Sequence, residues 1–206
     1  MTKLKQRQRY SPDVHVTDEG MVEKTYRTKA LPLRIFGALF IFWESFIYSK
    51  LNGIEGIPRF LGKPDIYSLH ISFMGGKNLR ETSRKPDASY YERLGRIISC
   101  MHERDVVHID MRNRRNYGID EEGRPYLIDF SPSLYIPWPK TLKRLLTPLD
   151  WLGMLKIKGK VSPELLTEKE TRSMKIGCFL SYLWLPKKIF NLVKSFFKLL
   201  HSVLRH

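Results

Sequence analysis

The polar residues of the segment 106–130 have the types and the spacing that phosphoryl transfer requires. Asp110 follows a short apolar run and His108, Asn116 lies six positions later, and Asp129 stands near the end of a second apolar run. Phosphoryl transfer needs one carboxylate to orient the attacking hydroxyl. It also needs an amide and a second carboxylate to hold Mg²⁺ against the nucleotide phosphates. We therefore predict that Asp110 orients the acceptor and that Asn116 and Asp129 bind the metal.

The residues between Asn116 and Asp129 predict a β-hairpin. Apolar runs at 117–119 and 125–128 flank Asp-Glu-Glu-Gly, a composition typical of a tight turn. Such a hairpin would bring the two predicted metal ligands together at its open end. The alternative is a surface hairpin with incidental acidic residues. It leaves the carboxylate of Asp129 without the cation or donors that a buried charge needs.

The loop after Asp110 is one residue longer than the common pattern, in which the asparagine lies five residues after the aspartate. Asn113 is a rival ligand, and we favour Asn116 because it directly precedes the hairpin. Arg112, Arg114 and Arg115 crowd the same loop. Their guanidinium groups could stabilise the transferred charge or bind an anionic acceptor. The alternative is that they are solvated loop side chains.

An amine and a third carboxylate lie nearer the N-terminus. Residues 14–16 and 21–27 flank a Thr-Asp-Glu-Gly turn and predict another hairpin, with Lys24 in the middle of its second strand. A strand lysine in this setting holds the α- and β-phosphates when a helix glutamate orients it. Glu44, within the apolar segment Leu31–Leu51, is the candidate partner. The alternatives are a solvent-exposed lysine and a glutamate on a helix face without a partner.

The segment Leu31–Leu51 is apolar enough to suggest a membrane span. A span needs about 20 predominantly apolar residues, and Arg34, Glu44 and Lys50 interrupt this one. We therefore predict a helix that is buried on most sides and ends at Asn52-Gly53.

A strand pattern at 66–73 precedes Met74-Gly75-Gly76, which we predict to be a hinge with an adenine ring against Met74. The expected fold is α+β and bilobal. Residues 1–75 would form a small β-rich N-lobe with a long helix, and residues 76–170 a reduced, mostly helical C-lobe. Short helical patches are expected at 151–160 and 162–170, within the C-lobe. Residues 171–206 would form a basic amphipathic C-terminal helical segment.

These motifs resemble those of the bacterial lipopolysaccharide kinases, the Kdo and heptose kinases, within the RIO-like part of the protein-kinase-like superfamily. The resemblance spans about residues 14–170. It implies a two-lobed kinase that uses ATP and Mg²⁺ on the cytoplasmic side of envelope synthesis, and the family's longer loop supports Asn116 over Asn113. The residues that carry the resemblance are Val22–Arg27, Trp43-Glu44, Gly53–Gly62, His108–Phe130 and Ser162–Thr167.

Three features depart from the kinase pattern. Gly20 is the only glycine before Lys24, so no Gly-rich phosphate loop is visible. The triplet at the second aspartate is Asp129-Phe130-Ser131 rather than one that ends in glycine, and no Ala-Pro-Glu follows it. Three interpretations stay open: a kinase acting on a sugar hydroxyl of a membrane glycolipid, a RIO-like protein serine/threonine kinase, and a pseudokinase that serves as a membrane-bound interaction module.

Length and cysteine content limit the remaining possibilities. With 206 residues and two widely separated cysteines, the chain fits one bilobal unit in a reducing compartment. Its N-terminus lacks the apolar core of a secretory signal. We expect a monomer, cytoplasmic and peripheral at the inner face of the cytoplasmic membrane, with a glycolipid or protein hydroxyl as acceptor.

The formal net charge of +15 favours an anionic partner. Residues 187–206 have the pattern of a basic amphipathic helix, which we predict to lie on an anionic membrane surface. The alternative is a helix that docks on the C-lobe. Nucleic-acid binding is disfavoured because the basic residues alternate with a wide aliphatic face rather than with a stacking platform.

Overall fold

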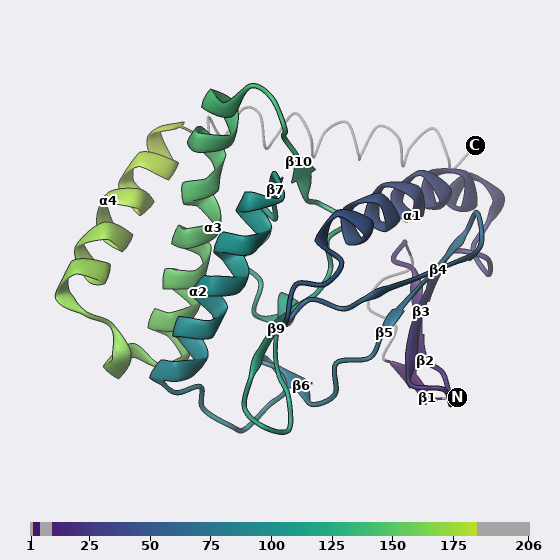
Figure 1. Ribbon diagram of the computed structural model, residues 1–206, viewed down its shortest axis with the longest axis horizontal. Helices are drawn as coiled ribbons and strands as arrows, with labels where there is room; N and C mark the ends of the chain where they lie inside the picture. The colour runs from purple at the N-terminus through teal and green to yellow at the C-terminus, as the bar shows by residue number, and fades with distance from the viewer. Residues whose placement is uncertain (1, 5–9, 185–206) are drawn as a thin grey trace. The chain divides into compact units, whose positions relative to one another are not determined.

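The computed structural model describes residues 2–4 and 10–184 (Figure 1). The chain divides into two compact units, residues 1–165 and residues 166–206. Each unit is described by itself. The predicted basic helix at 187–206 lies outside the described residues, and the predicted domain boundaries stay predictions.

An antiparallel five-stranded sheet forms the first part of the larger unit, with the order β1-β2-β3-β5-β4. The predicted N-terminal hairpin is present as β2 and β3, and Gly20 in its turn has a φ of +71°. Lys24 lies opposite Val14 on one side and Leu69 on the other, so its strand is internal to the sheet. The strands are β1 (Thr2–Leu4), β2 (Asp13–Val16), β3 (Met21–Thr25), β4 (Phe60–Asp65) and β5 (Ser68–Ser72).

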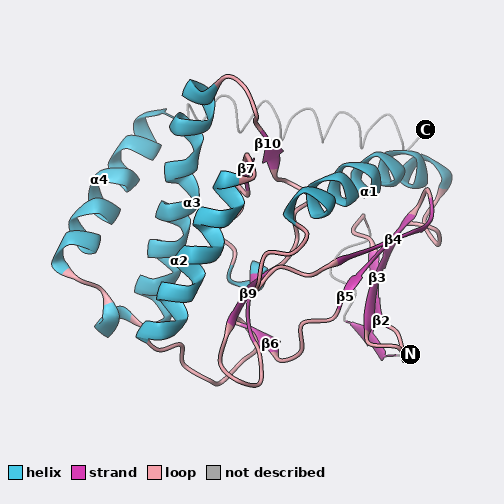
Figure 2. Cartoon of the chain, in the orientation of Figure 1, coloured by secondary structure: helices cyan, strands magenta, loops and turns pink. Residues whose placement is uncertain are grey.

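Helix α1 (Leu31–Leu51) packs against β4 and β5 of this sheet (Figure 2). Its predicted bounds are confirmed. Within the described residues it is the one helix whose length and apolar composition would allow it to cross a membrane. Its C-terminal half is buried, with Ile47 and Leu51 fully covered. The prediction that the helix is buried on most sides is wrong for its N-terminal half, where several large apolar side chains are exposed.

Helices α2 and α3 form the scaffold of the second part of this unit, and two small sheets lie beside them (Figure 1). Asp87 caps α2, because its carboxylate accepts the N–H of Tyr90 at 2.8 Å. The helices are α2 (Ala88–Glu103) and α3 (Lys140–Val161), with 3-10 turns η1 (Arg114–Asn116) and η2 (Pro163–Leu165); the strands are β6 (Lys77–Asn78), β7 (Val106–Val107), β8 (Tyr117–Ile119), β9 (Pro125–Leu127) and β10 (Leu134–Tyr135).

The sequence predicted only a short helical patch at 151–160, and this prediction is wrong in extent. Helix α3 begins at Lys140 and has 22 residues, with Pro148 inside it. An internal proline removes one backbone hydrogen bond and normally ends a helix. Helix α3 nevertheless continues through Pro148, and it packs against α2 and β7.

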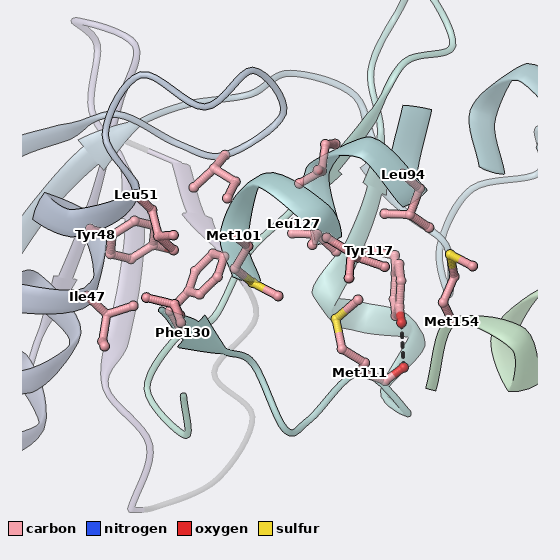
Figure 3. Close-up of a cluster of buried hydrophobic side chains, with 14 of the residues drawn as sticks. Ile47, Tyr48, Leu51, Leu94, Met101, Met111, Tyr117, Leu127, Phe130 and Met154 are labelled. Carbon is pink, nitrogen blue, oxygen red and sulfur yellow. Dashed lines mark hydrogen bonds between the residues drawn. The ribbon is translucent and has the colours of Figure 1, made fainter. Parts of the chain in front are cut away.

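A continuous apolar core joins the two parts of the larger unit (Figure 3). Tyr48 of α1 contacts the ring of Phe130 edge-on, with a centroid distance of 5.2 Å. Phe130 in turn lies 4.8 Å from the ring of His108. Farther along, the hydroxyl of Tyr117 donates to the carbonyl of Met111 at 2.5 Å. The core therefore contacts both loops that carry the predicted catalytic and metal-binding carboxylates.

The smaller unit contains α4 (Glu168–Trp184), which begins with a reciprocal cap. Thr167 Oγ1 accepts the N–H of Glu170, and the carboxylate of Glu170 accepts the N–H of Thr167. This capping box satisfies two N–H groups that the first turn would otherwise leave unpaired.

Glycine is required in α3 where the helix meets the loop after Asp110. A Cβ on Gly153 would lie 2.5 Å from Met111 Cβ and 2.8 Å from its backbone carbonyl atoms. A Cβ on Gly95, in the middle of α2, would meet nothing closer than 3.5 Å, at Trp151. The two helix glycines should therefore respond to alanine in opposite directions.

We predict that Gly153→Ala lowers the free energy of unfolding by about 1–3 kcal/mol, because backbone must move to admit the methyl group. Gly95→Ala should raise it by roughly 0.5–1 kcal/mol through helix propensity. Urea unfolding followed by circular dichroism measures both. A stabilising Gly153→Ala would contradict the close packing of α3 on this loop.

Candidate active site

Lys24 brings together two carboxylates from distant parts of the chain. Its Nζ lies 2.7 Å from Glu44 Oε1 and 2.9 Å from Asp129 Oδ1. Only 14% of the Lys24 side chain and 2% of the Glu44 side chain are exposed, whereas 40% of the Asp129 side chain is. The predicted pairing of Lys24 with Glu44 is present, and Asp129 opens the cluster to the outside.

Ser131 is a fourth member of this cluster that the sequence analysis noted only as a departure from glycine. Its hydroxyl donates to Glu44 Oε2 at 2.7 Å and receives a hydrogen bond from Lys24 Nζ at 3.2 Å. The hydroxyl therefore lies between the carboxylates of Glu44 and Asp129. Glycine at this position would remove both contacts.

The charges of the cluster depend on one another. Burial opposes the positive charge of Lys24, but Asp129 and Glu44 together raise its pKa well above the ordinary value. Lys24 holds the pKa of Asp129 below its usual range, although burial acts in the other direction. Burial raises the pKa of Glu44, and the attraction of Lys24 offsets part of that rise. Lys24 is thus charged, and Asp129 is the carboxylate most readily kept ionised.

The loop that follows β7 holds Asp110 beside Asn116. Asn116 is buried, and its Nδ2 donates to Asp110 Oδ2 at 3.0 Å and to the Asp110 carbonyl at 3.1 Å. Asn113 Nδ2 lies farther away, 3.5 Å from the same carboxylate oxygen, and its Oδ1 accepts the N–H of Arg115. Asn116 is therefore the closer amide, while Asn113 caps the turn η1.

The predicted hairpin that carries Asn116 and Asp129 is present as β8 and β9. Tyr117 pairs with Leu127, and the N–H of Ile128 donates to the carbonyl of Asn116 at 2.9 Å. This bond places Asn116 directly beside the residue that precedes Asp129. Asp129 itself has a φ of +68°, a conformation uncommon for residues other than glycine, and it turns the chain out of the strand.

Asp150 of α3 is a positioning residue that sequence reasoning missed. Its carboxylate is fully buried, and it accepts the backbone N–H groups of His108 and Ile109, both at 2.8 Å. His102 lies 2.9 Å from the same carboxylate. Ile109 has a φ of +66°, an outlier for a β-branched residue. Asp150 therefore fixes a strained backbone immediately before Asp110.

The remaining predicted site residues, Met74 and Arg112, lie on the same unit, and within the described part of the chain neither makes a hydrogen bond or an ion pair with the residues above. Met74 and the two glycines after it connect the five-stranded sheet to β6, as a hinge would, and both glycines have positive φ. Arg112 and Arg114 are exposed, and Arg115 is half-buried. Among the described residues none of these three arginines has an acidic partner within ion-pair distance.

The donor atoms of this site fit a magnesium-bound nucleotide. No described residue donates a hydrogen bond to Asp129 Oδ2 or to Asn116 Oδ1, so an oxygen of each remains for a cation, which prefers oxygen ligands. The ammonium of Lys24 supplies a positive charge for phosphate oxygens. The turn between β2 and β3 does not contribute a glycine-rich cradle, because Thr17-Asp18-Glu19-Gly20 closes it tightly through the bond from Gly20 N–H to the Thr17 carbonyl at 3.1 Å.

Comparison with known proteins relates the chain to solved structures only through its fold. No protein-family model and no curated protein sequence matches it. The Rio2 kinase of Chaetomium thermophilum, solved as a complex with ADP, Mg²⁺ and phosphoaspartate, has a TM-score of 0.58 and 16% identity, and the match covers 80% of this chain. A second Rio2 kinase structure from the same organism has a TM-score of 0.52 and 14% identity, with 84% of this chain and 70% of that chain covered.

The predicted α+β, protein-kinase-like fold is confirmed, because these Rio2 kinase structures share it. The chain spans 57% of the length of the first Rio2 chain. Identity at this level supports the architecture and leaves the chemistry to be argued from the residues.

We predict that Lys24→Met lowers the free energy of unfolding by about 3–5 kcal/mol at neutral pH, because it leaves the buried carboxylate of Glu44 without its cation. The deficit should grow as the pH rises above the ordinary carboxyl pKa of about 4.3. In this variant burial keeps the pKa of Glu44 raised, so ionisation of Glu44 destabilises the folded protein as the pH rises. Without Lys24 the pKa of Asp129 is no longer lowered, so the stabilisation that Asp129 contributes at higher pH is lost as well.

The double variant Lys24→Met/Glu44→Gln is the control, because it removes the unpaired charge and keeps the shape. It should be more stable than Lys24→Met at pH 7 and should depend less on pH. Urea unfolding between pH 4.5 and 8 provides the comparison. Equal pH dependence in the single and double variants would mean that Lys24 does not neutralise Glu44.

Proposed function

We propose that this chain is an ATP- and Mg²⁺-dependent phosphotransferase that phosphorylates an alcohol group. The observation that carries the proposal is the ammonium of Lys24 held between Glu44 and Asp129, on the same unit in which Asn116 fixes Asp110. The Rio2 neighbour bound to ADP and Mg²⁺ supports it at the level of the fold.

Each residue has a distinct part in the proposed reaction. Glu44 orients Lys24, which binds the α- and β-phosphate oxygens. Asn116 and Asp129 hold Mg²⁺, which when bound neutralises charge on the β- and γ-phosphates. Asn116 binds Asp110 Oδ2, so that Oδ1 remains to accept the hydrogen bond of the acceptor hydroxyl. Asp110 in this way orients the attacking oxygen and takes up its proton.

Met74 is the residue against which we propose that the adenine ring lies. It lies two residues beyond the end of β5 and is half-buried, and the glycines at 75 and 76 allow the chain to turn toward β6. A Cβ on Gly76 would lie 2.0 Å from the carbonyl oxygen of Ile119. This close approach ties the connecting segment to the hairpin that carries Asn116.

The acceptor that we propose is a sugar hydroxyl of an anionic glycolipid of the lipopolysaccharide type. The three arginines at 112, 114 and 115, which have no acidic partner among the described residues, support this class, because guanidinium groups bind carboxylates and phosphates in a bidentate manner. Arg112 lies two positions after Asp110 and is exposed. We place the enzyme at the inner face of the cytoplasmic membrane, where such an acceptor is made.

A RIO-like protein serine/threonine kinase is the second candidate, and the Rio2 neighbours favour it specifically. A pseudokinase is the third, and the tight acidic turn at 17–20 in place of a glycine-rich loop favours it. Turnover separates the kinases from the pseudokinase. The nature of the accepted hydroxyl, on a glycolipid or on a serine-containing protein, separates the first two.

Substitution of the two aspartates tests the phosphotransferase. We predict that Asp110→Asn lowers kcat by roughly 10²–10⁴-fold and leaves Mg²⁺-ATP binding nearly unchanged. Asp129→Asn should abolish turnover and weaken binding in Mg²⁺ but not in its absence, because it removes a metal ligand. Phosphate transfer from radiolabelled ATP and calorimetric titration measure these quantities.

Glu121→Gln, in the exposed turn of the β8–β9 hairpin, is the matched control and should keep full activity. Unchanged turnover in both aspartate variants would remove the catalytic assignment. Nucleotide binding by the wild-type protein without turnover on any acceptor would favour the pseudokinase.

Arg112→Gln tests the acceptor. With extracted bacterial envelope glycolipids as substrate, we expect the acceptor KM to rise about tenfold, in keeping with the loss of one charge-assisted contact, while the KM for ATP stays the same. Arg96→Gln, an exposed arginine on α2, is the control. An unchanged acceptor KM would show that Arg112 is a solvated loop side chain.

A further inference from the structure

The outward side of α1 between Leu31 and Phe42 is a continuous apolar surface. Its residues recur at helical spacing, so they lie next to one another on the helix. Their exposed fractions range from 44% to 65%. We call this surface the α1 apolar face; it consists of Leu31, Ile35, Phe36, Leu39, Phe40 and Phe42. An exposed apolar surface of this kind marks an interaction site.

The α1 apolar face is additional to the side with which the helix packs on its own domain. Gly37 and Ile41 are buried on that inner side, and a Cβ on Gly37 would lie 2.3 Å from the ring of Tyr26. The inner side thus already serves the core. None of the residues of the exposed face belongs to the buried core of the described unit.

Two basic residues, Arg34 and Lys63, border the α1 apolar face. The helix has no acidic residue in its first turn, and its single acidic residue, Glu44, is buried against Lys24. Two basic groups lie at the margin: Lys63 Nζ is 5.1 Å from the centroid of the Phe42 ring, and the Arg34 guanidinium is 4.5 Å from that of Tyr67. Neither cation has an acidic partner among the residues that the structure describes. The whole chain carries a net charge of +15.

An apolar surface bordered by unpaired cations is complementary to an anionic lipid surface. Phe and Leu side chains enter the boundary between headgroups and acyl chains, and Lys or Arg at the margin attract acidic headgroups. The helix does not cross the bilayer, because its C-terminal half is buried in the core and carries Glu44 into the site. The geometry is that of a helix lying along the interface.

We propose that the α1 apolar face inserts into the headgroup region of a membrane that contains anionic lipid. Glu44 belongs to the same helix and lies about 12 Å beyond Phe36 along its axis, at 1.5 Å per residue. The inserted helix thus leads directly to the site around Lys24. Binding itself does not depend on the proposed phosphotransferase activity, so the two proposals can fail separately.

The test is flotation of the full-length chain with vesicles of phosphatidylcholine, with and without 30% phosphatidylglycerol (about a third anionic lipid, a composition chosen to give a strong surface potential). We expect binding to the anionic vesicles that weakens as the salt concentration rises. The triple variant Ile35→Gln/Leu39→Gln/Phe42→Gln keeps helix propensity and should lower the partition coefficient by roughly tenfold or more. Lys63→Gln should lower it to a smaller extent, and on anionic vesicles only.

Two control variants make the test specific. Leu142→Gln/Leu145→Gln changes exposed apolar residues of α3, and should bind vesicles as the wild type does. Asp110→Asn should also bind normally, whatever its activity. Circular dichroism and thermal unfolding of each variant establish that it is folded.

Several results would overturn the proposal. Undiminished vesicle binding by the folded triple variant would exclude the α1 apolar face. An equal loss in the α3 variant would show that binding is not specific to α1. If the triple variant instead converted a dimer to a monomer in sedimentation, the face would cover a second copy of the chain. If it lowered thermal stability and exposed residues 185–206 to protease with binding unchanged, the chain's own C-terminal segment would be the occupant.

Discussion

A buried ammonium group is tolerated in a protein only where acidic groups compensate its charge. In this protein the ammonium of Lys24 is such a group, and the fold must bring carboxylates to it. Glu44 approaches from α1 and Asp129 from the loop after β9, 20 and 105 positions away in the sequence. The contact between the sheet and the rest of the unit is therefore polar at one point and apolar around it. Tyr48, which follows Glu44 by one helical turn, packs on Phe130, which follows Asp129.

Asp150 compensates a different cost in the second part of the unit. The backbone at Ile109 adopts a conformation that strains a β-branched residue by about 1–3 kcal/mol. The backbone N–H groups of His108 and Ile109 donate to the carboxylate of Asp150, and these bonds hold the backbone there. The absence of a side chain at Gly153 lets α3 come close enough to accept these bonds. The position of Asp110 thus depends on a helix that begins thirty residues later in the chain.

Local pattern was sufficient to predict much of the site. The two hairpins follow from alternating strands around acidic glycine-containing turns, and one of them places Asn116 next to the residue before Asp129. The pairing of Lys24 with Glu44 followed from the known needs of phosphate binding. Asp150 could not be found in this way, because the two groups that it positions are backbone N–H groups, which leave no mark in a sequence.

Two other features were misjudged for physical reasons. The length of α3 was underestimated: the helix continues through Pro148, because packing against neighbouring elements outweighs the local penalty of a proline. The segment Leu31–Leu51 is apolar on all sides, and sequence alone cannot divide such a helix into a half that meets the core and a half that stays exposed. That division depends on how far the sheet and the second part of the unit extend along the helix.

The most direct test of the central claim is a crystal structure of the protein grown with a non-hydrolysable ATP analogue and Mn²⁺, with the metal located by its anomalous scattering. The account predicts a metal peak coordinated by Asp129 and Asn116, and a triphosphate in contact with the ammonium of Lys24. A nucleotide bound away from Lys24, or a metal with no ligand from this pair, would contradict it.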